Sequence, residues 1–298
     1  MPYITSKKNS EAPVKIYYED LGKGEPVVLI HGWPVSHEMW EYQLTRLPEE
    51  GFRCIAYDRR GFGKSDRPWN GYDYTTLAKD LRALLEELEL ERVTLVGFSM
   101  AGGEVVRYCS QYNCERVSKV VLVSSIAPFM LKNDSNPDGV PLEMFDEMVR
   151  QLQNDRPAFL SAFGKQFFGV NWATHPVSSD LLGWMQGLAL PSSPRATLEC
   201  LRAFAGTDLR REMQSIKVPT LIIHGNGDKT VPFAPTGQQA AKLIPGAVLK
   251  VYEDAPHGLF ITEKEELTKD LIDFINSGTV TSFHYQPEIQ PVEEQSPF

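Results

Sequence analysis

The chain has 298 residues, of which 42% are hydrophobic and 23% charged, as in an ordinary globular enzyme. Its net charge of -9 at pH 7 argues against a nucleic-acid partner, because an acidic surface repels phosphate groups. The apolar runs, such as Val27–Ile30, are far shorter than the roughly 18 residues of a membrane-spanning helix, and residues 1–10 lack the apolar core of a signal peptide, so no membrane partner is expected.

Short runs rich in β-branched residues alternate along the chain with segments of helical periodicity. The predicted strands are Pro2–Thr5, Val14–Tyr18, Val27–Ile30, Arg53–Tyr57, Val93–Val96, Lys119–Val123, Thr220–Ile223 and Leu249–Tyr252. The predicted helices cover about 37–48, 74–89, 100–112, 236–244 and 264–276. This alternation predicts an α/β fold with an eight-stranded, mostly parallel sheet flanked by helices.

The alternation stops between about residues 126 and 217, where no strong strand pattern occurs. We interpret 126–217 as a helical cap above the carboxyl ends of the strands, where open α/β sheets bind ligands. Residues 1–125 and 218–276 then form the core. The polar, proline-containing segment 277–298 is predicted to be a flexible tail.

A candidate nucleophile lies between the strand at Val93–Val96 and the helix at 100–112. The run Gly97-Phe98-Ser99-Met100-Ala101 matches the nucleophile elbow, in which a sharp strand-to-helix turn raises a serine above the sheet. The usual pattern is G-x-S-x-G, and Ala101 departs from it at the last position. The alternative is that Ser99 only caps an ordinary helix.

A base and an acid are expected after the serine, in the chain order Ser, Asp or Glu, His. His257 follows the last predicted strand, and Asp228 follows the strand at Thr220–Ile223. Asp228 would fix the tautomer of His257 and stabilise its imidazolium form. The alternatives are a surface-loop histidine and an aspartate in a glycine-rich turn.

An oxyanion hole is expected from two backbone N–H groups. Trp33 follows the strand Val27–Ile30 and Met100 follows the nucleophile, so their N–H groups are the candidate donors. His31 is interpreted as a structural hydrogen-bonding residue and not as a base.

Several motifs together resemble the family of cofactor-free haloperoxidases and aryl esterases. The resemblance covers about residues 3–276, and its motifs are His31-Gly32-Trp33-Pro34, the run Ala56–Asp66, Gly97–Met100, His224-Gly225 and Ala255–Gly258. It implies an α/β-hydrolase fold, ester hydrolysis and perhydrolysis, in which hydrogen peroxide releases the acyl group as a peracid; in some relatives it also implies lactam hydrolysis. No haem, vanadium, flavin or other metal or cofactor is implied. In the resembled family, Pro at position 34 accompanies perhydrolase members.

The expected substrate is a small ester or lactam, with hydrogen peroxide as a candidate co-substrate, and the sequence leaves open whether the chain forms a homo-oligomer. Candidate pocket residues are those near the strand ends and the aromatic residues of the cap: Pro34, Phe129, Phe145, Phe163, Phe204 and Val231. Their alternative role is to form the apolar core of the cap.

The four cysteines form no Cys-x-x-Cys pair, so zinc or thioredoxin-like chemistry has no support. We interpret them as reduced, small apolar residues, which predicts a cytoplasmic location. The serine at position 99 argues against dehalogenases and epoxide hydrolases, which place Asp there. A lactam or amide hydrolase and a non-catalytic ligand receptor remain as alternatives to an esterase with perhydrolase activity.

Overall fold

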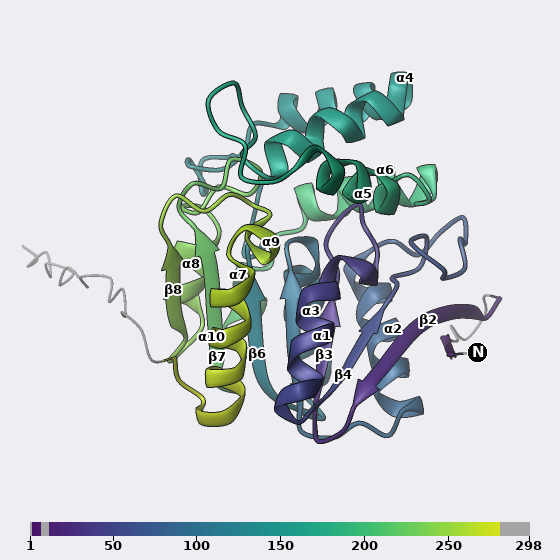
Figure 1. Ribbon diagram of the computed structural model, residues 1–298, viewed down its shortest axis with the longest axis vertical. Helices are drawn as coiled ribbons and strands as arrows, with labels where there is room; N and C mark the ends of the chain where they lie inside the picture. Colours follow the sequence, from purple (N-terminus) through teal and green to yellow (C-terminus); the bar gives the residue numbers. More distant parts are fainter. Residues whose placement is uncertain (1, 7–11, 281–298) are drawn as a thin grey trace, which may run out of the picture.

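The computed structural model describes residues 2–6 and 12–280, and its centre is one eight-stranded sheet (Figure 1). The strands lie in the order β1-β2-β4-β3-β5-β6-β7-β8. Pairs β1–β2 and β2–β4 are antiparallel, and the other pairs are parallel. The strands are β1 (Tyr3–Ser6), β2 (Val14–Gly22), β3 (Glu25–Ile30), β4 (Phe52–Tyr57), β5 (Val93–Phe98), β6 (Val117–Val123), β7 (Thr220–Gly225) and β8 (Val248–Tyr252). The predicted fold class is confirmed.

The apolar runs of the sequence became the central parallel strands because those strands are covered on both faces. Every residue of β5 is buried, and Val96 pairs with Leu29 of β3 and with Val121 of β6. The eight predicted strands are all present. The largest boundary difference is at β2, which runs on to Gly22, beyond the predicted end at Tyr18, because Asp20 and Leu21 pair with β4.

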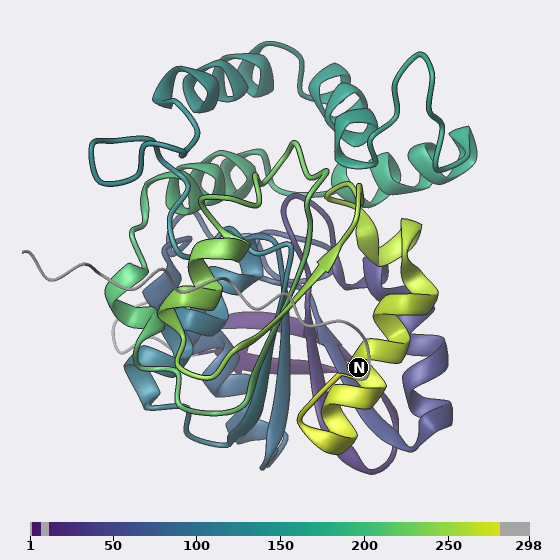
Figure 2. The ribbon, with the colours of Figure 1, turned by 90° about the vertical axis from the view of Figure 1, so that its left-hand side faces the viewer.

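Helices cover both faces of the sheet and the edge at which the parallel strands end. Helices α1 and α10 cover one face, and α2, α3 and α8 cover the other (Figure 2). The helical elements are η1 (His37–Trp40), α1 (Glu41–Arg46), η2 (Leu47–Glu50), α2 (Tyr74–Glu87), α3 (Met100–Tyr112), α4 (Leu142–Phe167), α5 (Ser179–Ala189), α6 (Pro194–Gly206), α7 (Arg210–Met213), α8 (Gly237–Leu243), α9 (Leu259–Thr262) and α10 (Lys264–Ser277).

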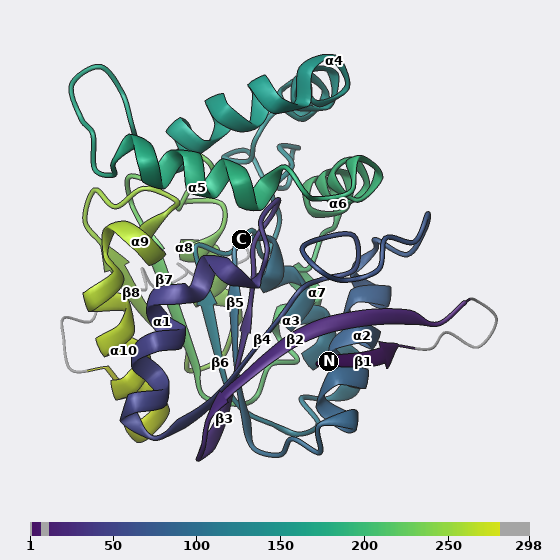
Figure 3. The same cartoon turned by 45° about the vertical axis from the view of Figure 1, so that its right-hand side comes forward.

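The segment between β6 and β7 supplies α4, α5 and α6, which lie above the carboxyl ends of the strands (Figures 1 and 3). The short helix α7, although inside the expected cap range 126–217, packs against α3 and α8 of the core. It does so because Leu209, Met213 and Ile216 are apolar and fully buried there.

Helix α4 bends in its middle. Asp155 has non-helical backbone angles, and Pro157 follows it inside the helix, where it cannot donate a backbone hydrogen bond. The Asp155 carboxylate accepts the Ala158 N–H at 3.0 Å and so caps the second half of the helix. The two halves therefore take different directions over the sheet (Figure 2).

The carboxyl-terminal part of the chain begins differently from the expected tail. Ser277 is still the last residue of α10, and Val280, which is 4% exposed, packs against the core. The rest of that range, 281–298, lies outside the described residues. Within residues 2–6 and 12–280, none of the helices combines the length and the apolar character needed to cross a membrane.

Candidate active site

Ser99 lies at the sharp turn between β5 and α3. Its φ is +55°, a value that costs energy for a residue with a side chain and that persists only where neighbouring contacts hold it. The Ser99 N–H donates to the Val123 carbonyl of β6 at 2.9 Å, and the Ser99 carbonyl accepts the Gly102 N–H at 3.0 Å. The turn is therefore anchored to the neighbouring strand and to the first turn of α3.

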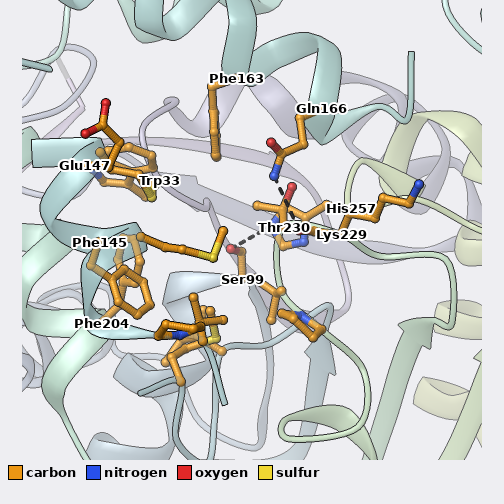
Figure 4. Close-up of a pocket in the computed structure, with 18 of the residues that line it drawn as sticks. Trp33, Ser99, Phe145, Glu147, Phe163, Gln166, Phe204, Lys229, Thr230 and His257 are labelled. Carbon is orange, nitrogen blue, oxygen red and sulfur yellow. Dashed lines mark hydrogen bonds between the residues drawn. The ribbon is translucent and has the colours of Figure 1, made fainter. Parts of the chain in front are cut away.

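His257 lies in hydrogen-bonding reach of Ser99 on one side and of Asp228 on the other. The distance from His257 Nε2 to Ser99 Oγ is 2.8 Å (Figure 4). The distance from His257 Nδ1 to Asp228 Oδ2 is 2.6 Å. The three residues come from three separate loops, after β5, β7 and β8. They meet because parallel strands bring their carboxyl ends to one edge of the sheet.

The His257 ring packs against two aromatic rings. Phe98, the last residue of β5, lies 4.9 Å from it between ring centroids, and Phe167, at the end of α4, lies 4.7 Å away and perpendicular to it. The Gly258 N–H donates to the Phe167 carbonyl at 2.8 Å. The histidine loop is therefore fastened to the cap as well as to the core.

The Asp228 carboxylate is buried and well supplied with hydrogen-bond donors. Its Oδ1 accepts the N–H groups of Thr230 at 2.9 Å and Val231 at 2.8 Å. Burial alone would raise the pKa of Asp228, but the imidazoles of His257 and His224 and their hydrogen bonds outweigh burial and lower that pKa to about 2. Asp228 is thus ionised at neutral pH and able to hold a proton on His257 Nδ1.

His31 holds the loop that follows β3. Its Nε2 accepts the Arg59 N–H at 2.9 Å, so the imidazole proton is on Nδ1, which donates to the Gly32 carbonyl at 2.7 Å. Burial, with the nearby charge of Arg59, lowers the pKa of His31 to about 3. The neutral ring therefore fixes the Gly32 carbonyl, and with it the plane of the peptide that carries the Trp33 N–H. Met100 begins α3 directly after Ser99.

A buried ionic network, which sequence reasoning missed, connects this loop to helix α3. Arg59 donates through Nε to Glu104 at 2.9 Å and through Nη2 to the His31 carbonyl at 2.9 Å. Tyr57 also hydrogen-bonds to Glu104. Arg59 and Glu104 are essentially unexposed. The network links the loop that bears Trp33 to the helix that begins at Met100.

A cavity of about 570 Å³ opens over Ser99 and His257 between the core and the cap (Figure 4). Most of its lining is apolar, and the polar lining residues are Ser99, Glu143, Glu147, Gln151, Gln166, Lys229, Thr230 and His257. Besides Ser99 and His257, it is lined by Trp33, Ile126, Met130, Gly139, Val140, Pro141, Glu143, Met144, Phe145, Glu147, Met148, Gln151, Phe159, Ala162, Phe163, Gln166, Phe204, Lys229, Thr230, Val231 and Pro232.

Of the expected pocket residues, Phe145, Phe163, Phe204 and Val231 line this cavity. The two others do not. Pro34 lines a second, much smaller cavity, and Phe163 lines both cavities. The Phe129 ring instead lies under the Arg210 guanidinium, 5.1 Å from its carbon to the ring centroid.

Sequence reasoning did not select Met144, Met148, Gln166 or Lys229 as lining residues. Met144 and Met148 lie four apart in α4, and this helical spacing was the available signal. Gln166 donates to the Lys229 carbonyl at 3.3 Å. The two residues are 63 apart in the chain, so no local sequence pattern predicts this contact. In the part of the chain that the structure describes, no group of three or more His, Cys, Asp or Glu side chains is placed to hold a metal ion.

Comparisons with known proteins agree on one family. The model of the alpha/beta hydrolase fold family matches residues 25–264. A putative non-heme chloroperoxidase from Synechocystis sp. is 42% identical over 92% of this chain and all of its own length. A bifunctional esterase/perhydrolase from Acinetobacter calcoaceticus is 38% identical over 93% of this chain and all of its own length.

Solved structures lead to the same group. The crystal structure of a bromoperoxidase from Bacillus anthracis superposes with a TM-score of 0.88 at 45% identity, covering 92% of this chain and 99% of that one. An esterase from Exiguobacterium antarcticum gives a TM-score of 0.87 at 38% identity, covering 93% and 99%. The chain therefore belongs to the alpha/beta hydrolase fold family, and within it to the group that contains the non-heme haloperoxidases and the esterase/perhydrolase.

Proposed function

We propose that this protein is a serine hydrolase that cleaves small carboxylic esters through an acyl-enzyme on Ser99 and transfers the acyl group to water or to hydrogen peroxide. The observation that carries the proposal is the unbroken chain of two hydrogen bonds from Ser99 through His257 to Asp228. Ser99, at one end of this series of hydrogen bonds, lines a largely apolar cavity. The same arrangement of nucleophile, base and orienting acid performs acyl transfer on unrelated folds.

Acylation begins when Ser99 Oγ attacks the ester carbonyl and His257 Nε2 takes the hydroxyl proton. Asp228 keeps the other imidazole proton on Nδ1 and stabilises the imidazolium that forms. The N–H groups of Trp33 and Met100 are the proposed donors to the oxyanion, the first held by the bond from His31 to the Gly32 carbonyl. His257 then gives its proton to the leaving alcohol.

Deacylation reverses these roles with a new nucleophile. His257 removes a proton from water or hydrogen peroxide as it attacks the acyl carbon, and the proton then passes to Ser99 Oγ as the C–O bond to the enzyme breaks. Water gives a carboxylic acid and hydrogen peroxide gives a peracid. A peracid formed in this way can oxidise bromide or chloride in solution, so the halogenation step needs no metal or other cofactor in the protein.

The cavity favours substrates with a small apolar or aromatic acyl group. The Trp33 ring meets Phe163 and Phe204 edge-to-face, at 5.3 and 5.6 Å between ring centroids. A volume of about 570 Å³ is within the range of sites for small molecules. The four cysteines are free and buried, which supports the proposed cytoplasmic location. The lactam-hydrolase and receptor alternatives are not needed to account for the relatives described above.

The experiment is a panel of small esters assayed with and without hydrogen peroxide, with peracid followed by bromide oxidation. Ser99→Ala is expected to lower ester hydrolysis by about 10⁴–10⁶-fold. Ser118→Ala is the control and should keep full activity. Ser118 lies near the start of β6, whereas Ser99 contacts Val123 at the end of that strand. Ser99→Ala activity above a few per cent, with contamination excluded, would refute the assignment.

Two further results are expected from the same assay. Activity should fall on the acid side, because a protonated His257 cannot accept the Ser99 proton. A chelator such as EDTA should leave the rate unchanged. A loss that one added metal restores would contradict the cofactor-free mechanism.

A further inference from the structure

Three thioether side chains line the cavity that contains Ser99. Met130 comes from the segment after β6, and Met144 and Met148 lie one turn apart in α4. Sulfur atoms are visible among the side chains around Ser99 in Figure 4. By contrast, Met39 and Met213 are fully buried in the core and are not among the lining residues.

A peracid and a thioether are a reactive pair. The terminal peroxide oxygen is electrophilic, and the methionine thioether readily accepts one oxygen to become a sulfoxide. A peracid formed at Ser99 is released into the cavity that Met130, Met144 and Met148 line. One molecule in a volume of 570 Å³ corresponds to a local concentration of about 3 M, far above any concentration that the product reaches in bulk.

We propose that the peracid made by this enzyme oxidises the side chains of Met130, Met144 and Met148. The inference rests on the proposed perhydrolysis at Ser99. In the reaction, the O–O bond of RC(=O)OOH breaks, its terminal oxygen forms an S–O bond, and the proton of that oxygen passes to the carboxylate oxygen, so that RC(=O)OH leaves. The sulfur is oxidised and the peroxide oxygens are reduced, so one peracid is consumed for each sulfoxide.

Exposure separates the three sites. Met144 is 56% exposed, so oxidants in bulk solution also reach it. Met130 is 2% exposed and lines the cavity, so oxidants meet it from the cavity side. Met148 is half-buried. Oxidation at Met130 therefore reports peracid inside the cavity, and oxidation at Met144 reports peracid that has left it.

Oxidation also has a consequence for catalysis. A sulfoxide is polar, and three of them would replace apolar lining with groups that prefer water. The affinity for an apolar acyl group should then fall as turnovers accumulate, and a methionine sulfoxide reductase should restore it. The enzyme would thus lose activity in proportion to the peracid that it makes.

The test compares sulfoxide formation by peptide mass spectrometry under matched conditions. Wild-type enzyme receives an acetate ester, hydrogen peroxide and an excess of free methionine as a bulk scavenger. Ser99→Ala receives the same mixture in one arm, and peracetic acid in place of ester and peroxide in another. In wild-type enzyme we expect several-fold more sulfoxide at Met130 and Met148 than in either Ser99→Ala arm. We expect the scavenger to suppress oxidation at Met144. We expect Met39 to stay unmodified in every arm.

Bromide oxidation without scavenger, measured in parallel, separates the two levels of the proposal. If peracid forms and Met130 is oxidised no more than in Ser99→Ala, the inference is wrong and the proposed function stands. If no peracid forms, perhydrolysis itself is refuted, and the inference with it. If the scavenger protects Met130 as fully as Met144, the peracid escapes before it reacts and the inference is also wrong.

A second measurement follows the decay of activity during perhydrolysis, each variant relative to its own initial rate. The double variant Met130→Leu, Met148→Leu replaces thioethers with apolar side chains of similar volume. Its activity should decay several-fold more slowly than that of wild type. Met213→Leu, in the core, is the matched control and should decay like wild type. Equal decay of all three proteins would overturn the inference.

Discussion

Gly102 lies in the first turn of α3, three residues after Ser99, and the structure leaves no room there for a side chain. A Cβ atom built at this position would lie 2.6 Å from Ser125 Cβ and would overlap Ser125 Oγ. The Gly102 N–H also donates to the Ser99 carbonyl. Gly102→Ala therefore forces α3 and the segment after β6 apart at the point where both contact Ser99.

The size of the effect follows from the overlap. Carbon atoms pack at about 3.5–4.0 Å, so a separation of 2.6 Å requires about 1 Å of movement. Overpacking of this kind lowers the free energy of unfolding by about 1–3 kcal/mol. The higher helix propensity of Ala compared with Gly offsets at most about 1 kcal/mol of that loss. A displacement of about 1 Å in a catalytic group can cost about 10²-fold in rate. We therefore expect Gly102→Ala to lower kcat by up to about 10²-fold and the free energy of unfolding by up to about 3 kcal/mol.

The assay measures kcat and KM for one acetate ester together with urea unfolding of each variant. Gly183→Ala in α5 is the control, because a Cβ there meets no atom within 4 Å. It should keep kcat and gain up to about 1 kcal/mol of stability. Adding Ser125→Gly to Gly102→Ala removes both overlapping atoms and should recover part of the lost kcat. Wild-type kcat and stability in Gly102→Ala alone would refute the reasoning.

Further expectations concern the charged groups around the site. Asp228→Asn should lower kcat by about 10⁴-fold, measured by steady-state kinetics, because the amide no longer secures the reactive tautomer of His257. The pKa of His31 is lowered to about 3 in the folded state, so the unfolded chain binds the extra proton between about pH 6.5 and 3. The free energy of unfolding should therefore decrease as the pH is lowered from about 6.5 to 3. In urea unfolding, His31→Asn should show a smaller decrease over the same window. Glu104→Gln leaves the buried Arg59 without its counter-charge and should cost about 3–5 kcal/mol in the same unfolding assay.

The strand pattern and the position of the three site loops could be predicted because they depend on local signals. Buried parallel strands are continuous apolar runs, and the residues after them must meet at one sheet edge. That rule placed Ser99, Asp228 and His257 in one region, where the structure brings them into hydrogen-bond contact. Phe159, Phe163 and Phe167 are spaced four residues apart, which is typical of one helix face, but this spacing does not assign their different contacts.

Those different contacts come from the loops that meet the second half of α4, because all three rings follow the bend at Asp155 and Pro157. Phe159 and Phe163 line the cavity, and Phe167 packs on His257 instead. Asp155 and Pro157 cause the bend, but its direction is set by what the second half of the helix packs against. Sequence periodicity gives the face of a helix and not its neighbour, so it could not separate Phe167 from the two other rings.

The network of Glu104 and Arg59 escaped sequence analysis for a related reason. The two residues are 45 apart in the chain, and each belongs to a segment that reads as ordinary helix or loop. A lone buried charge would be costly, so each position is tolerable only because the other exists. A pairing of this kind is defined by the folded sheet that brings the ends of β4 and α3 together, and no window of sequence contains both partners. Because Arg59 also donates to the His31 carbonyl, the same fold-dependent pair connects the loop after β3 to α3, the helix that follows Ser99.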